Sequence, residues 1–107
     1  MARSVYLLTR DLLFRSKLAG LVDSVGAATT RDAAAGDLVV IELEARDWEA
    51  TIRSARARGI PVLAFGPHVN TTMLRRAREL GAEAVPNSQV ERRVMELLGA
   101  APSEPVR

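Results

Sequence analysis

Five short apolar runs are spaced along the chain and predict five β-strands. They lie at residues 4–9, 27–30, 37–43, 60–65 and 83–86. The run DLVVIEL at 37–43 is apolar at consecutive positions, which is typical of a parallel strand covered on both faces. Pro61 lies near the start of the fourth run, where a missing backbone N–H group costs least.

Apolar residues at helical spacing occupy most of the connections between these runs. The stripes are Phe14, Leu18 and Val22; Trp48, Ile52 and Ala55; Met73, Ala77 and Leu80; and Val90, Val94 and Leu97. The residues expected to cap the four helices at their N-termini are Asp11, Asp47, Asn70 and Ser88. The connection RDAAAG at 31–36 has room for little more than one helical turn, so the second helix of the pattern is predicted to be shortened.

Strands that alternate with helices at this spacing predict an α/β fold, with an open parallel sheet and helices on both faces. Five such strands most often take the flavodoxin-like order 2-1-3-4-5, whose functional site lies beyond the carboxyl ends of the strands. We expect one domain at residues 1–99, followed by a flexible C-terminal tail at 100–107.

The composition narrows the classes of function. The 107-residue chain has no cysteine, which excludes disulfides and thiolate chemistry and fits a cytoplasmic protein. No apolar run approaches the ~20 residues needed to cross a bilayer, so we expect no membrane association. The net charge is only +2 and aromatic residues make up only 4%, so nucleic acid is an unfavoured partner despite the many arginines.

Polar residues follow the predicted strands at the edge where a site is expected. The residues at these strand ends are Thr9, Arg10 and Asp11; Glu42 and Glu44; Gly66, Pro67 and His68; and Asn87 and Ser88. The carboxyl ends of parallel strands meet at one edge of a sheet, so these side chains are candidates for a shared site.

Three segments resemble the response-regulator receiver domains. DLVVIEL is similar to their third strand, IPVLAF to their fourth strand, and LRRARELGAEAVP to their fourth helix and fifth strand. The resemblance covers roughly residues 4–99 and implies the flavodoxin-like order. It also implies a site that transfers a phosphoryl group to an aspartate, using a bound Mg²⁺, a hydroxyl and a lysine.

By position, the residues that this chemistry requires are replaced in this chain. The acceptor position holds Glu42, and the acidic pair falls on Thr9 and Arg10, with Asp11 beside them. The hydroxyl position holds Gly66, and the lysine position holds Asn87, or Ser88 if the loop differs by one residue. We therefore expect a degenerate receiver-like domain that lacks the acceptor aspartate, is not an enzyme, and needs no metal or other cofactor.

Several chemistries for this edge remain open. An ion pair between Arg10 and Glu42 is the favoured one, because a partly buried carboxylate seldom stays unpaired. The less favoured ones are a metal site of Asp11, Glu42, Glu44 and His68, a hydrolase set of His68, Ser88 and an acidic residue, and a phosphate site at GPHVNTT.

The favoured function is contact with a protein partner in signalling or regulation. The alternatives are a flavodoxin-like protein that binds a small ligand or nucleotide and, less favoured, a nucleic-acid accessory protein. The fourth and fifth helices of the receiver layout carry both signs of charge, so their surface is a candidate for a weak homodimer. The residues nominated for this partner surface are Arg75, Arg76, Glu79, Arg92 and Arg93.

Overall fold

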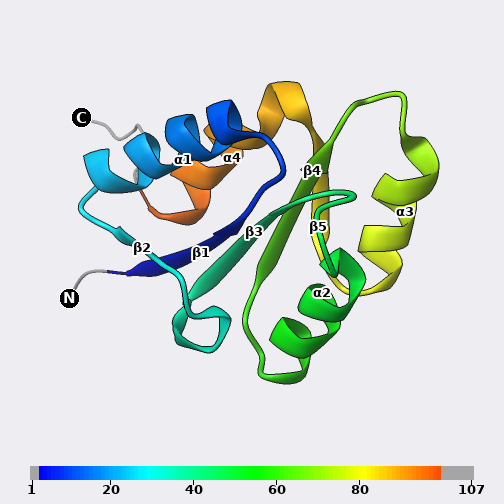
Figure 1. The fold of residues 1–107 in the computed structure, drawn as a ribbon, viewed down its shortest axis with the longest axis horizontal. Helices are drawn as coiled ribbons and strands as arrows, with labels where there is room; N and C mark the ends of the chain where they lie inside the picture. The colour runs from blue at the N-terminus through cyan, green and yellow to red at the C-terminus, as the bar shows by residue number, and fades with distance from the viewer. Residues whose placement is uncertain (1–2, 100–107) are drawn as a thin grey trace.

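The computed structural model describes residues 3–99. Five parallel strands form one sheet in the order β2-β1-β3-β4-β5 (Figure 1). The strands are β1 (Ser4–Leu8), β2 (Ala28–Thr30), β3 (Leu38–Glu42), β4 (Val62–Gly66) and β5 (Glu83–Pro86). The predicted fold class and strand order are confirmed. The predicted tail at 100–107 lies outside the described residues.

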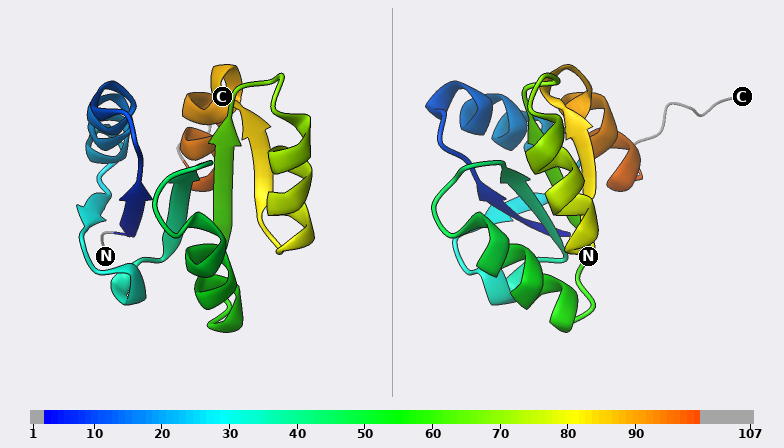
Figure 2. Two further views of the ribbon diagram at one scale, coloured as in Figure 1. Left: turned by 45° about the vertical axis from the view of Figure 1, so that its right-hand side comes forward. Right: turned by 90° about the vertical axis from the view of Figure 1, so that its right-hand side faces the viewer.

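Four α-helices cover the two faces of the sheet. They are α1 (Leu12–Ser24), α2 (Trp48–Ala57), α3 (Thr71–Glu79) and α4 (Val90–Leu97). Helices α1 and α4 lie on one face, and α2 and α3 lie on the other (Figures 1 and 2). Between β2 and β3 the chain forms only the single 3₁₀ turn η1 (Ala33–Ala35), which confirms the shortened second helix. No helix within residues 3–99 is both long and apolar enough to cross a membrane.

Each face of the sheet has its own apolar core. Under α1 and α4, Phe65 and Leu18 are fully buried, and the Phe14 ring lies 5.1 Å from the Phe65 ring, centroid to centroid. Under α2 and α3, Ile41, Ile52 and Leu74 are buried. The continuous apolar run of β3 is explained by this arrangement, because its successive side chains enter opposite cores.

The predicted helix caps are right at two helices and wrong at two. The carboxylate of Asp11 accepts from the Leu13 N–H at 2.8 Å, and the Asn70 side chain accepts from the Met73 N–H at 3.4 Å. Asp47 precedes α2 but has a left-handed backbone with φ 57°, outside the extended conformation that lets a side chain cap a helix, and it makes no cap bond. Ser88 lies inside a second 3₁₀ turn, η2 (Asn87–Gln89), so Gln89 rather than Ser88 occupies the position before α4.

Candidate functional site

The residues nominated from the sequence gather at the carboxyl edge of the sheet. Thr9, Arg10 and Asp11 follow β1 directly, Glu42 is the last residue of β3, and Gly66 is the last residue of β4. His68 lies in the loop between β4 and α3, and Asn87 begins η2 just after β5. The parallel register brings these strand ends together, since Leu8 pairs with Ile41 and Glu42 pairs with Phe65.

The carboxylate of Glu42 is already bound by the protein backbone. Its Oε1 atom accepts from the N–H of Arg10 at 2.7 Å and from the N–H of Asp11 at 3.1 Å. Both donors belong to the loop that connects β1 to α1, so the side chain of Glu42 ties the end of β3 to that loop. Charge-assisted hydrogen bonds of this kind are roughly twice as strong as bonds between neutral groups.

The predicted ion pair between Arg10 and Glu42 is wrong. The Arg10 guanidinium contacts Glu44 instead, with Nη1 at 3.1 Å from Oε1. The backbone of Arg10, rather than its side chain, reaches Glu42, which leaves the guanidinium free to extend past the end of β3. Both side chains of the observed pair are about half exposed, so water weakens their attraction.

Glu44 links two loops across the edge. Besides Arg10, its carboxylate contacts the Asn70 amide, with Nδ2 at 3.5 Å from Oε2, and Asn70 caps α3. Glu44 has φ 69° and Asp47 has φ 57°, so one short loop holds two non-glycine residues in the left-handed region. This conformation costs roughly 1–2 kcal/mol per residue for an ordinary side chain. The contacts to Arg10 and Asn70 offset part of that cost at Glu44.

Gly66 occupies a tightly packed position. A Cβ atom built on Gly66 would lie 3.0 Å from Cδ1 and 3.3 Å from Cβ of Leu43. Leu43 is itself buried under α2 and α3. At the position where a receiver carries a hydroxyl, this chain therefore has no room for a side chain unless Leu43 moves.

Replacing Gly66 with threonine should destabilise the protein by about 1–3 kcal/mol, which is the usual cost of overpacking a filled core. Urea denaturation followed by circular dichroism measures this difference. As a control, the same substitution in a Leu43→Ala background should cost less, because the clashing methyl groups are gone. A Gly66→Thr variant as stable as the unmodified chain would show that Leu43 moves aside at little cost.

The remaining nominated residues do not form a second cluster. His68 is exposed, and the Asp11 carboxylate is engaged as a helix cap. Across residues 3–99, no three side chains of the metal-binding types come close enough together to hold a metal ion. The Oδ1 atom of Asn87 is buried and has no hydrogen-bond partner within the described chain.

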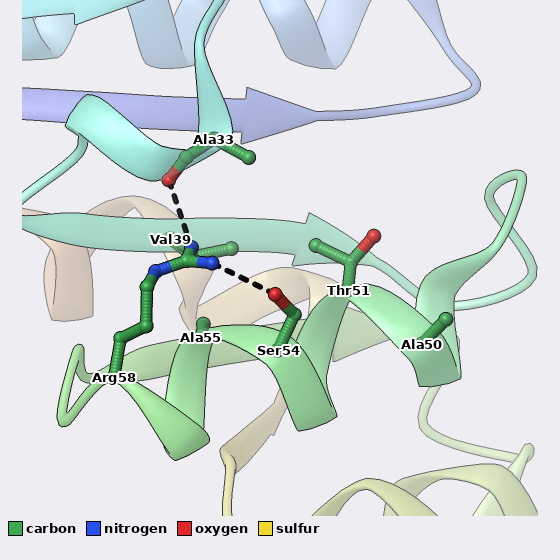
Figure 3. Close-up of a pocket in the computed structure, with 7 residues that line it drawn as sticks. All are labelled: Ala33, Val39, Ala50, Thr51, Ser54, Ala55 and Arg58. Carbon is green, nitrogen blue, oxygen red and sulfur yellow. Dashed lines mark hydrogen bonds between the residues drawn. The ribbon is translucent and has the colours of Figure 1, made fainter.

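A shallow apolar pocket of about 170 Å³ lies between η1 and α2 (Figure 3). Small side chains of α2 line it, and Arg58 lies across it, donating to the Ala33 carbonyl at 3.3 Å and to the Ser54 hydroxyl at 2.8 Å. Arg58 is the only ionisable residue in its lining, so the pocket lacks the groups that acid–base chemistry needs. Its walls come from segments far apart in the sequence, which is why no single motif indicated it.

The nominated partner residues lie in two different places. Arg75, Arg76 and Glu79 line an open groove of about 360 Å³ between α2 and α3, together with Trp48 and Met73. Arg93 instead contacts Glu83 on the edge strand β5, and Arg92 is exposed on α4. Figure 2 shows β5 between α3 and α4 at this edge of the molecule.

Solved structures with the same fold are receiver domains and proteins that contain them. NtrX from Brucella abortus is 18% identical, with a TM-score of 0.74 over 94% of this chain and 27% of its own. The chemotaxis response regulator CheY4 of Vibrio cholerae is 10% identical, with a TM-score of 0.71 over 94% of this chain and 98% of its own. The receiver domain of a Pseudomonas aeruginosa sensor histidine kinase, with magnesium in its active-site cleft, is 13% identical, with a TM-score of 0.70 over 92% and 99% of the two chains.

These similarities establish the receiver fold. The chain spans about a quarter of the length of NtrX and almost the full length of the two single-domain structures. No protein-family model matches the sequence, and no curated protein matches it.

Proposed function

We propose that this chain is a receiver-like protein that is not phosphorylated and that acts by binding another protein in signalling or regulation. The observation that carries the proposal is the engagement of Glu42, whose Oε1 atom accepts two backbone N–H groups at 2.7 and 3.1 Å. An acceptor carboxylate must be able to approach the incoming phosphorus. Only Oε1 of Glu42 is engaged, but its two bonds hold the carboxylate against the loop after β1, and the side chain is one methylene longer than that of aspartate.

The surroundings of Glu42 support the same proposal. Arg10 supplies a positive charge beside the strand end, where a receiver would need carboxylates to bind Mg²⁺. Gly66 provides no hydroxyl, and Asn87 provides no ammonium group for the phosphoryl oxygens. In this proposal the protein performs no catalysis and needs no cofactor.

The contacts at the carboxyl edge also suit a constitutive mode of action. Glu42 and Glu44 connect the loops after β1, β3 and β4 using only groups of the chain itself. These contacts join the loops through the chain's own groups, and in this proposal the binding surface does not wait for a chemical signal. Binding is then set by the concentrations of the two proteins.

Treatment with Mg²⁺ and either acetyl phosphate or beryllofluoride should leave the protein unchanged. We expect no saturable shift of the amide resonances of Arg10, Asp11 and Glu42, and no gain of one phosphoryl mass. A phosphorylatable receiver domain run in parallel shows that the reagents are active. A saturable shift at these three amides, or the mass gain, would contradict the proposal.

In this proposal the partner is a different protein rather than a second copy of this chain. Arg76 contacts Glu49 at 3.4 Å and Glu79 at 3.5 Å, while Arg93 contacts Glu96 at 3.1 Å and is also paired with Glu83. The hydrogen bonds that Arg93 donates to Glu83, and then to Glu96, raise the pKa of its guanidinium above the usual value. The charges of Arg76 and Arg93 are already compensated within one molecule, so a dimer built on these two residues gains little. The weak homodimer stays a prediction.

A further inference from the structure

The groove between α2 and α3 combines an apolar floor with a positive charge that has no partner in the described chain. Trp48 and Met73 are half-buried at the groove, packed against the core beneath α2 and α3. Its volume of about 360 Å³ exceeds that of the pocket between η1 and α2, which is about 170 Å³. It is open to solvent along both helices rather than enclosed.

The charges that line the groove are not balanced. Glu49 is shared by Arg53 at 3.7 Å and Arg76 at 3.4 Å, and Glu79 contacts Arg76 at 3.5 Å. Arg75 also lines the groove, but no acidic side chain of residues 3–99 lies within 4.0 Å of it. Counting Arg53 with the four charged lining residues, three positive and two negative charges leave one positive charge in excess.

Resting on the proposed function, we infer that this groove is where the partner protein docks, through a segment with an acidic residue next to a large apolar side chain. The apolar side chain would lie on Trp48 and Met73, and the carboxylate would pair with Arg75. Trp, Met and Arg are enriched at protein interfaces, and Trp and Arg most often carry the binding energy. Favourable pairing of opposite charges would add specificity and speed to the encounter.

The chain offers a matched pair of arginines to test this inference. Arg75 and Arg92 are both exposed and neither has an acidic partner within the described residues, but only Arg75 lines the groove. Thr72 is an exposed residue of the first turn of α3 that also lines the groove, where an added carboxylate is compatible with the helix dipole. Arg75→Glu and Thr72→Glu therefore make the groove more negative. Arg92→Glu changes the net charge of the protein by the same amount as Arg75→Glu, but it does so outside the groove.

The probe is a random dodecapeptide library displayed on phage and selected on the full chain. We expect the enriched peptides to combine Asp or Glu with Leu, Phe or Trp, and to bind purified protein measurably in solution. Trp48 is the only tryptophan of the chain, so synthetic peptides that lack Trp should change its fluorescence on binding. Arg75→Glu and Thr72→Glu should each weaken binding at least tenfold, while Arg92→Glu should change it less than twofold. Circular dichroism confirms that all three variants are folded.

Other results would overturn the inference. Peptides whose binding is unchanged by Arg75→Glu and Thr72→Glu would place the contact elsewhere and would leave the proposed function intact. Binding lost with Leu13→Ala, which removes a side chain that is 74% exposed at the carboxyl edge, would move the contact to that edge. A Trp48 signal that changes with protein concentration alone would identify a second copy as the occupant. A failure to enrich any peptide would reject the groove as a docking site for a peptide segment.

Discussion

Replacing Phe65 with alanine should destabilise the protein by about 3–5 kcal/mol, which is the usual cost of removing a buried phenylalanine side chain. Phe65 is fully buried on β4, an interior strand of the sheet, and its ring contacts Phe14 of α1 with centroids 5.1 Å apart. The substitution leaves a cavity between β4 and α1 that the surrounding strands cannot close. For a domain of this size the melting temperature should fall by roughly 12 °C or more.

Thermal and urea denaturation measure this effect. Two controls define its origin. Phe65→Leu retains most of the buried volume and should cost far less, while Leu13→Ala removes a side chain that is 74% exposed and should change stability by less than about 0.5 kcal/mol. Since small domains are stable by only about 5–15 kcal/mol, Phe65→Ala removes a large fraction of the total. A cost similar to that of Leu13→Ala would show that Phe65 does not organise this core.

The fold was predictable because its signals are local and mutually consistent. DLVVIEL contains four consecutive apolar residues, which is typical of a strand with two covered faces, and RDAAAG is too short for a full helix. Right-handed connections between parallel strands then leave few topologies. The stripe that includes Met73 and Ala77 predicts the correct helix, although Leu74 rather than Met73 is the buried apolar residue near its start.

The details of the candidate site were less predictable because they depend on loop conformation. The sequence indicated that Arg10 and Glu42 meet, and they do, but the backbone of Arg10 makes the contact and its side chain pairs with Glu44. Glu44 has a left-handed backbone. A glycine or asparagine at this position would have indicated that conformation, but a glutamate does not. Asp47 is also left-handed, and its place just before a helix predicted a side-chain cap because aspartate is common at both kinds of position.

The sequence also did not predict on which side of α3 each charged residue lies. Arg78 donates to the Ala84 carbonyl of β5 at 2.9 Å, so that side of α3 faces the edge strand. Arg75, Arg76 and Glu79 lie toward α2 instead. Spacing identifies the apolar stripe of a helix, but the neighbours of its polar sides depend on how the helices pack.

The two hydrogen bonds accepted by Glu42 predict an order in which substitutions of Glu42 lower the free energy of unfolding. Both N–H groups donate to the same atom, Oε1, and Glu42 is partly buried. Glu42→Ala removes the acceptor altogether and should cost about 1–3 kcal/mol, because two backbone donors lose a charged partner. Glu42→Gln keeps an oxygen at that position and loses only the charge, so it should cost less than Glu42→Ala. Urea denaturation of the two variants measures the difference.

Arg10→Ala should have a much smaller effect than Glu42→Ala. The guanidinium of Arg10 pairs with Glu44 on the surface, where their side chains are 56% and 45% exposed, and such pairs contribute about 0–1 kcal/mol. The backbone N–H of residue 10 that binds Glu42 is unchanged by the substitution. In a double-mutant cycle, the effects of Arg10→Ala and Glu42→Ala should therefore add to within about 0.5 kcal/mol. A larger coupling would mean that the guanidinium pairs with Glu42 in solution. A Glu42→Gln variant as unstable as Glu42→Ala would mean that the charge, rather than the acceptor oxygen, holds β3 to the loop after β1.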